Sequence, residues 1–221
     1  GTLTNLGDGM VVLALPWLAT LMSHDPVAIG AVAAAGRLPW LLFAIPAGVI
    51  IDNSDHRKLI ARADILRAAI VAAIMMLAMS EHIDGAIWIL AALAFLLGSA
   101  EVLRDNAAQT MLPSIVETKD LESANGQLWS SEQLTGQFIG PPLAGILIAA
   151  GIGIPFGLDA ALLVLAAGLV WMISLKPRAK IQRSFRKALF EGIAFMRRDA
   201  LLLRLAIVLG IANFIATATI T

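Results

Sequence analysis

The sequence predicts an all-α polytopic membrane protein, and three observations support this fold class. Of the 221 residues, 59% are hydrophobic and only 14% are charged, whereas soluble domains have about 25% charged residues. Apolar runs near the ~20 residues of a helical membrane crossing recur along the chain, and short polar or glycine-rich turns separate them. Lysines and arginines gather in alternate turns. A soluble fold of this length would leave too much apolar surface in water.

The apolar runs predict a six-helix transmembrane bundle over residues 1–175 and the start of a truncated seventh helix over residues 200–221. The predicted spans are Leu3 to Met22, Pro26 to Ile51, Leu59 to Met79, Ala86 to Met111, Ala124 to Ala150 and Ile154 to Leu175, with a seventh that starts near Ala200. Because Gly1 lies almost inside the first span and Thr221 stops within the seventh, we expect a fragment, the first half of a protein built from six plus six helices.

Basic residues predict which helix ends face the cytoplasm. The turns at residues 23–26, 80–85 and 151–153 contain neither Lys nor Arg. The basic residues fall in the alternate turns, as Arg57, Lys58 and Arg62, then Lys119, then Lys176, Arg178, Lys180, Arg183, Arg186, Lys187, Arg197 and Arg198. The basic side is therefore expected to be cytoplasmic. Residues 176–199 predict a basic cytoplasmic linker with an amphipathic helix, which either lies on the inner leaflet or packs under the bundle as a strut.

Composition disfavours several classes of function. Sixteen basic and sixteen acidic residues balance, so nothing points to nucleic acid as a partner. The chain has no cysteine, and its three histidines lie in turns without a second ligand at metal spacing. It also has no Ser-His-Asp grouping and no glycine-rich loop of the kind that binds phosphates. We therefore expect no enzyme activity, no metal and no cofactor.

One short charged stretch joins the second and third predicted spans. It runs from Gly48 to Lys58 and contains Asp52 and Arg57. A turn this short keeps the two helices together, and an acid beside an Arg-Lys pair can join helix ends through charged hydrogen bonds. The simpler alternative is that these charges are only solvated.

The fifth predicted span contains a motif of small residues and prolines, with glycines at Gly136, Gly140 and Gly145 and a proline pair that begins at Pro141. Glycines four residues apart leave one helix face without side chains and permit close contact with a neighbouring helix. Prolines bend a helix and free backbone carbonyls. The motif predicts a bendable, closely packed helix, and a purely structural seam is the alternative.

Ionisable residues inside the spans suggest a mechanism, because a charge at the bilayer centre costs about 3 kcal/mol. A rise of ~1.5 Å per residue places Asp8, Arg104 and Glu132 at similar depths, roughly 8 to 13 Å from the cytoplasmic surface. They are predicted to meet in one cavity. Our hypothesis is that Asp8 or Glu132 takes up and releases a proton while Arg104 is its partner, and a static salt-bridge cluster is the alternative.

Further polar residues extend the predicted cavity. Glu101 and Asp105 share a face of the fourth span with Arg104, because they lie three or four residues apart. Gln133 and Gln137 form a polar stripe on the fifth span. These four residues are therefore candidates for the wall of a substrate cavity.

Other charges have local or open interpretations. Arg37 lies near mid-membrane, where it is expected either to bind an anionic substrate group or to pair with an acid. Asp64 and Arg67 are one helical turn apart and predict a local ion pair. Asp159 in the sixth span has no evident partner in the sequence.

Four stretches occur in an order that matches one family. They are Arg37 to Gly48 running on through Asp52 and Arg57 to Asp64 and Arg67, then Asn106 to Val116, then Ala124-Asn125, and finally Glu191 to Phe195. Together they resemble the major facilitator superfamily of secondary transporters, in its branch of macrolide-efflux and enterobactin-exporter-like proteins. The chain departs from the superfamily's signature loop at Asn53, Asp55 and His56, and from its antiporter motif at Ala144.

The resemblance implies a secondary active transporter of a bacterial inner membrane. It implies a proton-coupled exporter of small organic molecules, such as drugs or siderophores, that works by alternating access, with residues 136–145 similar to the antiporter motif. The implied partners are the substrate, protons, the lipid bilayer and the C-terminal half of the same transporter. The alternatives are an importing symporter or facilitator, and a membrane protein without transport activity that handles lipids or acts as a scaffold.

Overall fold

The computed structural model describes residues 1–80, 86–173, 204 and 208. Contacts divide the chain into two units, Gly1–Lys180 and Ile181–Thr221, and the description below concerns the first. The predicted linker at residues 176–199 lies outside the described residues. So does the predicted seventh helix, apart from Arg204 and Val208.

The first unit consists of helices joined by short turns, and no strand occurs among its described residues. The α-helices are α1 (Thr2–Met22), α2 (Pro26–Asp52), α3 (His56–Ala78), α4 (Ile87–Met111), α5 (Leu121–Ser131), α6 (Gly140–Ala150) and α7 (Ile154–Met172). Two 3₁₀ turns, η1 (Leu112–Ser114) and η2 (Thr118–Asp120), follow α4, and the π-helical segment η3 (Glu132–Ile139) joins α5 to α6.

Four helical segments are long and apolar enough to cross a membrane, namely Thr2–Met22, Pro26–Phe43, Ile87–Ser114 and Ile154–Met172. Helix α3 has sufficient length, but its first half carries the charged residues Arg57, Lys58, Arg62, Asp64 and Arg67. The fifth predicted span is a continuous run of α5, η3 and α6, and neither α-helix in it is long enough by itself. These helices confirm the predicted all-α membrane fold class.

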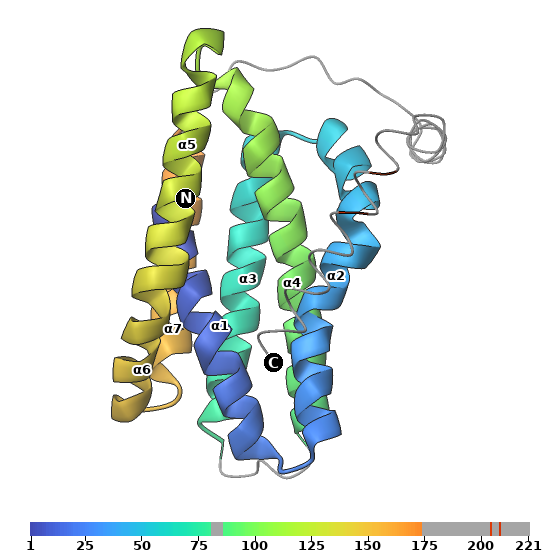
Figure 1. The fold of residues 1–221 in the computed structure, drawn as a ribbon, viewed down its shortest axis with the longest axis vertical. Helices are drawn as coiled ribbons and strands as arrows, with labels where there is room; N and C mark the ends of the chain where they lie inside the picture. Colours follow the sequence, from blue (N-terminus) through green and yellow to red (C-terminus); the bar gives the residue numbers. More distant parts are fainter. Residues whose placement is uncertain (81–85, 174–203, 205–207, 209–221) are drawn as a thin grey trace. The chain divides into compact units, whose positions relative to one another are not determined.

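The helices pack in an order that differs from their order in the chain. Helix α2 packs along α4, α4 along α3, α3 along α7, and α7 along α1, which also contacts η3 and α6. Figure 1 shows α3 and α4 side by side, with the α5–η3–α6 run on the other side of α1 from them. Helices α1, α3, α4 and α7 are therefore the ones whose inner faces can meet.

Short capping signals start two of these helices. The Asp25 carboxylate accepts a hydrogen bond of 2.9 Å from the amide of Val27, and Pro26 opens α2. Asp55 caps α3 in the same way by accepting from the amide of Lys58 at 3.2 Å. Because Asp55 follows α2 by only three residues, the cap also fixes the tight turn between α2 and α3.

A few polar side chains lie inside the unit beside its apolar core, and many large apolar side chains face outward. The buried polar residues are Thr4, Asp64, Arg67, Arg104 and Asp159. Large apolar side chains face outward, among them Leu41 at 81% exposure, Met172 at 80% and Phe138 at 77%. In water this surface would favour aggregation, whereas lipid accepts it, so the distribution fits a protein whose solvent is a bilayer.

Glycines bring α1 into backbone contact with η3 and α6. A Cβ atom on Gly9 would overlap the carbonyl oxygen of Gly136, and one on Gly140 would lie 2.7 Å from the Cα of Gly9. We call Gly9, Gly136 and Gly140 the glycine seam. The sequence predicted close contact at the last two, and the structure identifies α1 as the neighbouring helix.

Candidate functional site

Charged side chains from α1, α3 and α4 form one connected group. Arg67 of α3 donates a hydrogen bond to the carboxylate of Asp8 on α1, and its Nη1 atom lies 3.6 Å from Oδ1 of Asp64. The Nε atom of Arg104 on α4 lies 3.5 Å from the same Asp64 oxygen, and its Nη1 atom lies 2.7 Å from Asp105. We call Asp8, Asp64, Arg67, Arg104 and Asp105 the charge cluster.

Arg104 also binds a neutral partner on α1. Its Nη2 atom donates a hydrogen bond of 2.7 Å to the hydroxyl of Thr4. Since Thr4 and Asp8 are one turn apart on α1, this helix contacts both arginines of the cluster. The group therefore connects α1, α3 and α4 through side chains alone.

The centre of the charge cluster is fully enclosed, because Asp64 is 0% exposed and Arg67 is 1% exposed. Several of its buried atoms lack hydrogen bonds, namely both carboxylate oxygens of Asp64, Nε and Nη1 of Arg67 and Nε of Arg104. Their charges attract across 3.5 to 3.6 Å without hydrogen-bond geometry. A fully satisfied polar network would hold these helices more rigidly than this partly satisfied one does.

The structure brings together some of the residues that the sequence predicted for the cavity. Asp8 and Arg104 belong to one cluster, although Asp64 and Arg67 connect them instead of a direct contact. Glu101 is half-buried on α4, and its charge lies close enough to Asp8 and Arg67 to interact with them. The predicted local pair of Asp64 and Arg67 is present, but it is the centre of the cluster.

Other predicted site residues lie apart from the cluster. On η3, Glu132 and Gln137 are exposed and Gln133 is half-buried, and no hydrogen bond or ion pair joins any of the three side chains to a cluster residue. Arg37 on α2 is exposed and makes no ion pair with a described residue. The sequence placed Glu132 by its depth along the fifth span, and in the structure this residue begins η3 with an exposed side chain.

The loop between α2 and α3 was expected to hold these two helices together, but its charged hydrogen bond reaches α7 instead. Arg57 donates a hydrogen bond of 2.9 Å to the carbonyl of Ile173, the residue that ends α7, where a helix leaves unpaired carbonyls. Lys58 lies 4.0 Å from Asp55, and both side chains are exposed. Gly48 and Asp52 are exposed, and the Asp52 side chain makes no hydrogen bond or ion pair with a described residue. The charged contact therefore joins α3 to α7.

The predicted bendable motif lies where η3 changes into α6. The amide of Gly140 donates to the carbonyl of Thr135, five residues earlier, which is the π pattern. Pro141 and Pro142 follow at the start of α6, where their missing N–H groups break the regular α-helical bonds. Gly145 has open space where its Cβ would be, so it does not belong to the glycine seam.

The sequence suggested no partner for Asp159. In the structure this residue lies on α7 and is buried inside the unit. It is 1% exposed, and neither of its carboxylate oxygens has a hydrogen-bond partner. Its carboxylate lies against Gly7 of α1, where a Cβ atom would overlap Oδ1. Since Gly7 precedes Asp8, this acid lies beside the charge cluster.

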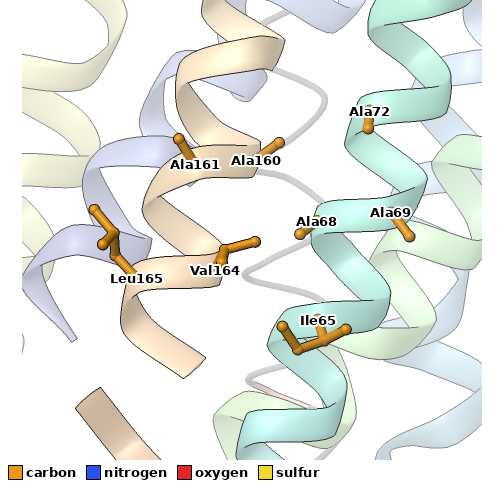
Figure 2. A pocket seen from close by; sticks show the side chains of 8 residues that line it. All are labelled: Ile65, Ala68, Ala69, Ala72, Ala160, Ala161, Val164 and Leu165. Atoms are coloured by element: carbon orange, nitrogen blue, oxygen red, sulfur yellow. The ribbon is translucent and has the colours of Figure 1, made fainter. Parts of the chain in front are cut away.

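An apolar groove of about 700 Å³ lies between α3 and α7. Figure 2 shows its lining side chains, which are Ile65, Ala68, Ala69, Ala72, Ala160, Ala161, Val164 and Leu165. None of them is charged or polar, so the groove suits hydrocarbon and contributes nothing to the charge cluster. Within residues 1–80 and 86–173, no three His, Cys, Asp or Glu side chains are grouped as metal ligands.

Comparison with known proteins gives consistent matches. A model of the transmembrane secretion effector family matches residues 1–221. The multidrug efflux pump Tap of Mycolicibacterium fortuitum is 32% identical over 148 residues, which cover 65% of this chain and 36% of that protein. Tap of Mycobacterium tuberculosis H37Rv is 29% identical over 234 aligned residues, which cover 96% of this chain and 52% of that protein.

The chain spans about half the length of the mycobacterial relative that it matches over most of its own length. No solved structure matches it significantly. The family match nevertheless covers every residue and agrees with the helical membrane fold and its buried charges. The chain therefore belongs to the transmembrane secretion effector family of the major facilitator superfamily, which is a family of transporters and not of enzymes.

Proposed function

We propose that the chain forms the N-terminal bundle of a proton-coupled exporter that moves small organic molecules, such as drugs, out of a bacterial cell by alternating access. In this bundle α1, α2, α3, α4 and α7 each cross the membrane once, and the run from α5 through η3 to α6 forms one further crossing. The relatives named multidrug efflux pumps support export of drugs. The charge cluster is the observation that supports proton coupling.

Asp8 is the proton carrier that the geometry favours. It lies at the edge of the charge cluster, with 24% of its side chain exposed, and pairs with the buried Arg67. Glu132, the other candidate, is exposed on η3 and has no ion pair among the described residues. A proton that binds Asp8 therefore acts directly on a buried contact.

Protonation of Asp8 changes the contact between α1 and α3. An ionised Asp8 attracts Arg67, whereas a neutral Asp8 loses this Coulomb attraction and frees the Arg67 charge to pair with another carboxylate. The helices then separate at lower cost, and access shifts from one face of the membrane to the other. If substrate binds one of the two states and protons bind the other, each shifts the equilibrium between the states in the opposite direction. Substrate and protons are thereby exchanged across the membrane.

Transport by the full-length protein tests this function. In everted membrane vesicles we expect proton-driven ethidium accumulation, and we expect Asp8→Asn to lower it more than tenfold. Glu132→Gln is the matched control, because it removes an exposed carboxylate that makes no ion pair with a described residue, and it should keep nearly full activity. Unchanged transport by Asp8→Asn would refute the mechanism, and transport in the opposite direction would refute export.

The proposed orientation places the turn between α2 and α3 in the cytoplasm and the turn between α1 and α2 outside. The chain has no cysteine, and both Lys58 and His24 are exposed. In a cysteine-free background of the full-length protein, an impermeant thiol reagent added to intact cells should label His24→Cys and spare Lys58→Cys. Labelling of the opposite residue would reverse the topology.

A further inference from the structure

Among the described residues, Asp159 carries a buried carboxyl group that the mechanism above does not use. Helix α7 carries it into the contact with α1, where Gly7 provides the space that a side chain would otherwise fill. Both oxygens are inaccessible and have no hydrogen-bond partner. An ionised carboxylate in this environment would lose its hydration and gain no compensating contact, so the neutral acid is the favoured form here.

The charges around Asp159 support the same form. The charged groups that act on it are Asp8 on α1, Asp64 and Arg67 on α3, and Glu101 on α4. Helix α6, which also contacts α7, has no titratable residue. The only cation in this set is Arg67, and Asp8 and Asp64 already engage it. A further negative charge at Asp159 would therefore have no free counter-ion.

Arg67 and Asp159 approach the same turn of α1. Arg67 binds Asp8, and Asp159 lies against Gly7, the preceding residue. Arg67 also has two buried nitrogen atoms without a hydrogen bond. The charge of its guanidinium group also acts on the carboxylate of Asp159.

We propose that Asp159 is a proton-binding site and that it alternates with Asp8 as the partner of Arg67. In the state described here Asp8 is ionised and paired, and Asp159 holds a proton. In the other state Asp8 has taken up a proton, Arg67 has moved to Asp159, and Asp159 has released its proton. One proton is bound and one is released, so the net charge of the buried group does not change. The coupling of this exchange to transport rests on the proposed function, whereas the proton on Asp159 does not.

Infrared spectroscopy of the full-length protein in lipid nanodiscs tests the proposal, because protonated carboxyl groups have a C=O stretching band that ionised ones lack. At neutral pH we expect Asp159→Asn to lose one such band. Asp120→Asn is the matched control, since Asp120 is exposed and makes no side-chain cap, and it should keep the wild-type spectrum. A spectrum of Asp159→Asn that equals the wild type in this region would overturn the proton site.

A second variant covers the case in which Asp159→Asn does not fold. In protein labelled with ¹³C at the aspartate carboxyl, Asp159→Glu keeps a carboxyl group but carries no label there. We expect the band to move to the unlabelled position. A labelled band that stays in place would assign the proton to another aspartate and overturn the proposal.

The exchange itself predicts a result for Asp8→Asn. This variant frees Arg67 to pair with Asp159, so we expect the Asp159 band to disappear at neutral pH although Asp159 is unchanged. An unchanged band would refute the alternation. These spectra need no transport, so a protein with the expected spectra and no proton-driven efflux would refute the proposed function and leave the Asp159 site intact.

Discussion

Helix α1 contacts its neighbours in two different ways within a single turn. Against η3 and α6 it presents Gly9, which packs on the backbone of Gly136 and Gly140 without any charge. Against α3 it presents Asp8, which binds the buried Arg67. The first contact depends on shape and is insensitive to pH, whereas the second is an ion pair, which protonation of Asp8 would weaken. The comparison suggests that a transporter can let one helix respond to a proton on one side while the other side keeps its register.

Loss of the ion pair between Asp8 and Arg67 should lower the stability more than a change in the glycine seam. Arg67→Met leaves Asp8 unpaired and Asp64 with only Arg104, and the loss of one partner from a buried ion pair costs about 3–5 kcal/mol. We expect a large drop in the apparent melting temperature of the purified full-length protein. Arg37→Met is the control, because Arg37 is exposed and makes no ion pair with a described residue.

A double variant sharpens this prediction. Asp8→Asn added to Arg67→Met removes the uncompensated charge, so it should recover part of the lost stability. Double-variant stability equal to the sum of the two single losses would show that the two residues act independently.

The glycine seam should respond to size instead of charge. Gly9→Ala places a methyl group on the carbonyl of Gly136, which is backbone and cannot turn aside. Overpacking of this kind costs about 1–3 kcal/mol, and the loss should not depend on pH. Gly145→Ala is the control, because nothing lies within 4 Å of its Cβ position. Equal melting temperatures for both variants would mean that α1 and η3 do not touch in the membrane.

The smallest effect is expected at the loop. Arg57→Gln removes the charged hydrogen bond to the carbonyl of Ile173, which is worth about 1.5–3 kcal/mol when buried and less here because the contact is only partly buried. Lys58→Gln removes an exposed pair at 4.0 Å and should change stability by at most about 0.5 kcal/mol. A larger effect for Lys58 than for Arg57 would contradict the geometry.

Much of the fold could be predicted from local signals. The second span was expected over Pro26 to Ile51 and is observed as Pro26–Asp52, because an acidic cap and a proline mark its start and its apolar run marks its end. The fifth span was expected to be one helix and contains the π segment η3. Its glycines and prolines predicted a bend, but the winding depends on how the segment packs against α1, which local sequence does not specify.

The site was less predictable because it depends on which helices are neighbours. Depth along each span brought Asp8 and Arg104 to one level, and the structure places both in the charge cluster. The same depth argument placed Glu132 at this level, and the structure has Glu132 exposed on η3. Arg67 was interpreted as a local partner of Asp64, since nothing in the sequence shows that α3 packs between α4 and α7. Its spacing from Asp64 was the only signal that could have pointed to the site.

The bond between Arg57 and Ile173 has a mechanical consequence. Only three residues separate α2 from α3, the Asp55 cap holds the start of α3, and Arg57 in its first turn binds the last carbonyl of α7. The end of α2, the start of α3 and the end of α7 are therefore coupled. A displacement of the end of α2 is transmitted through α3 to α7. The connection is short and hydrogen-bonded, and thus it resists bending, which lets motion at this end of the bundle occur as rotation of a block instead of independent tilting of single helices.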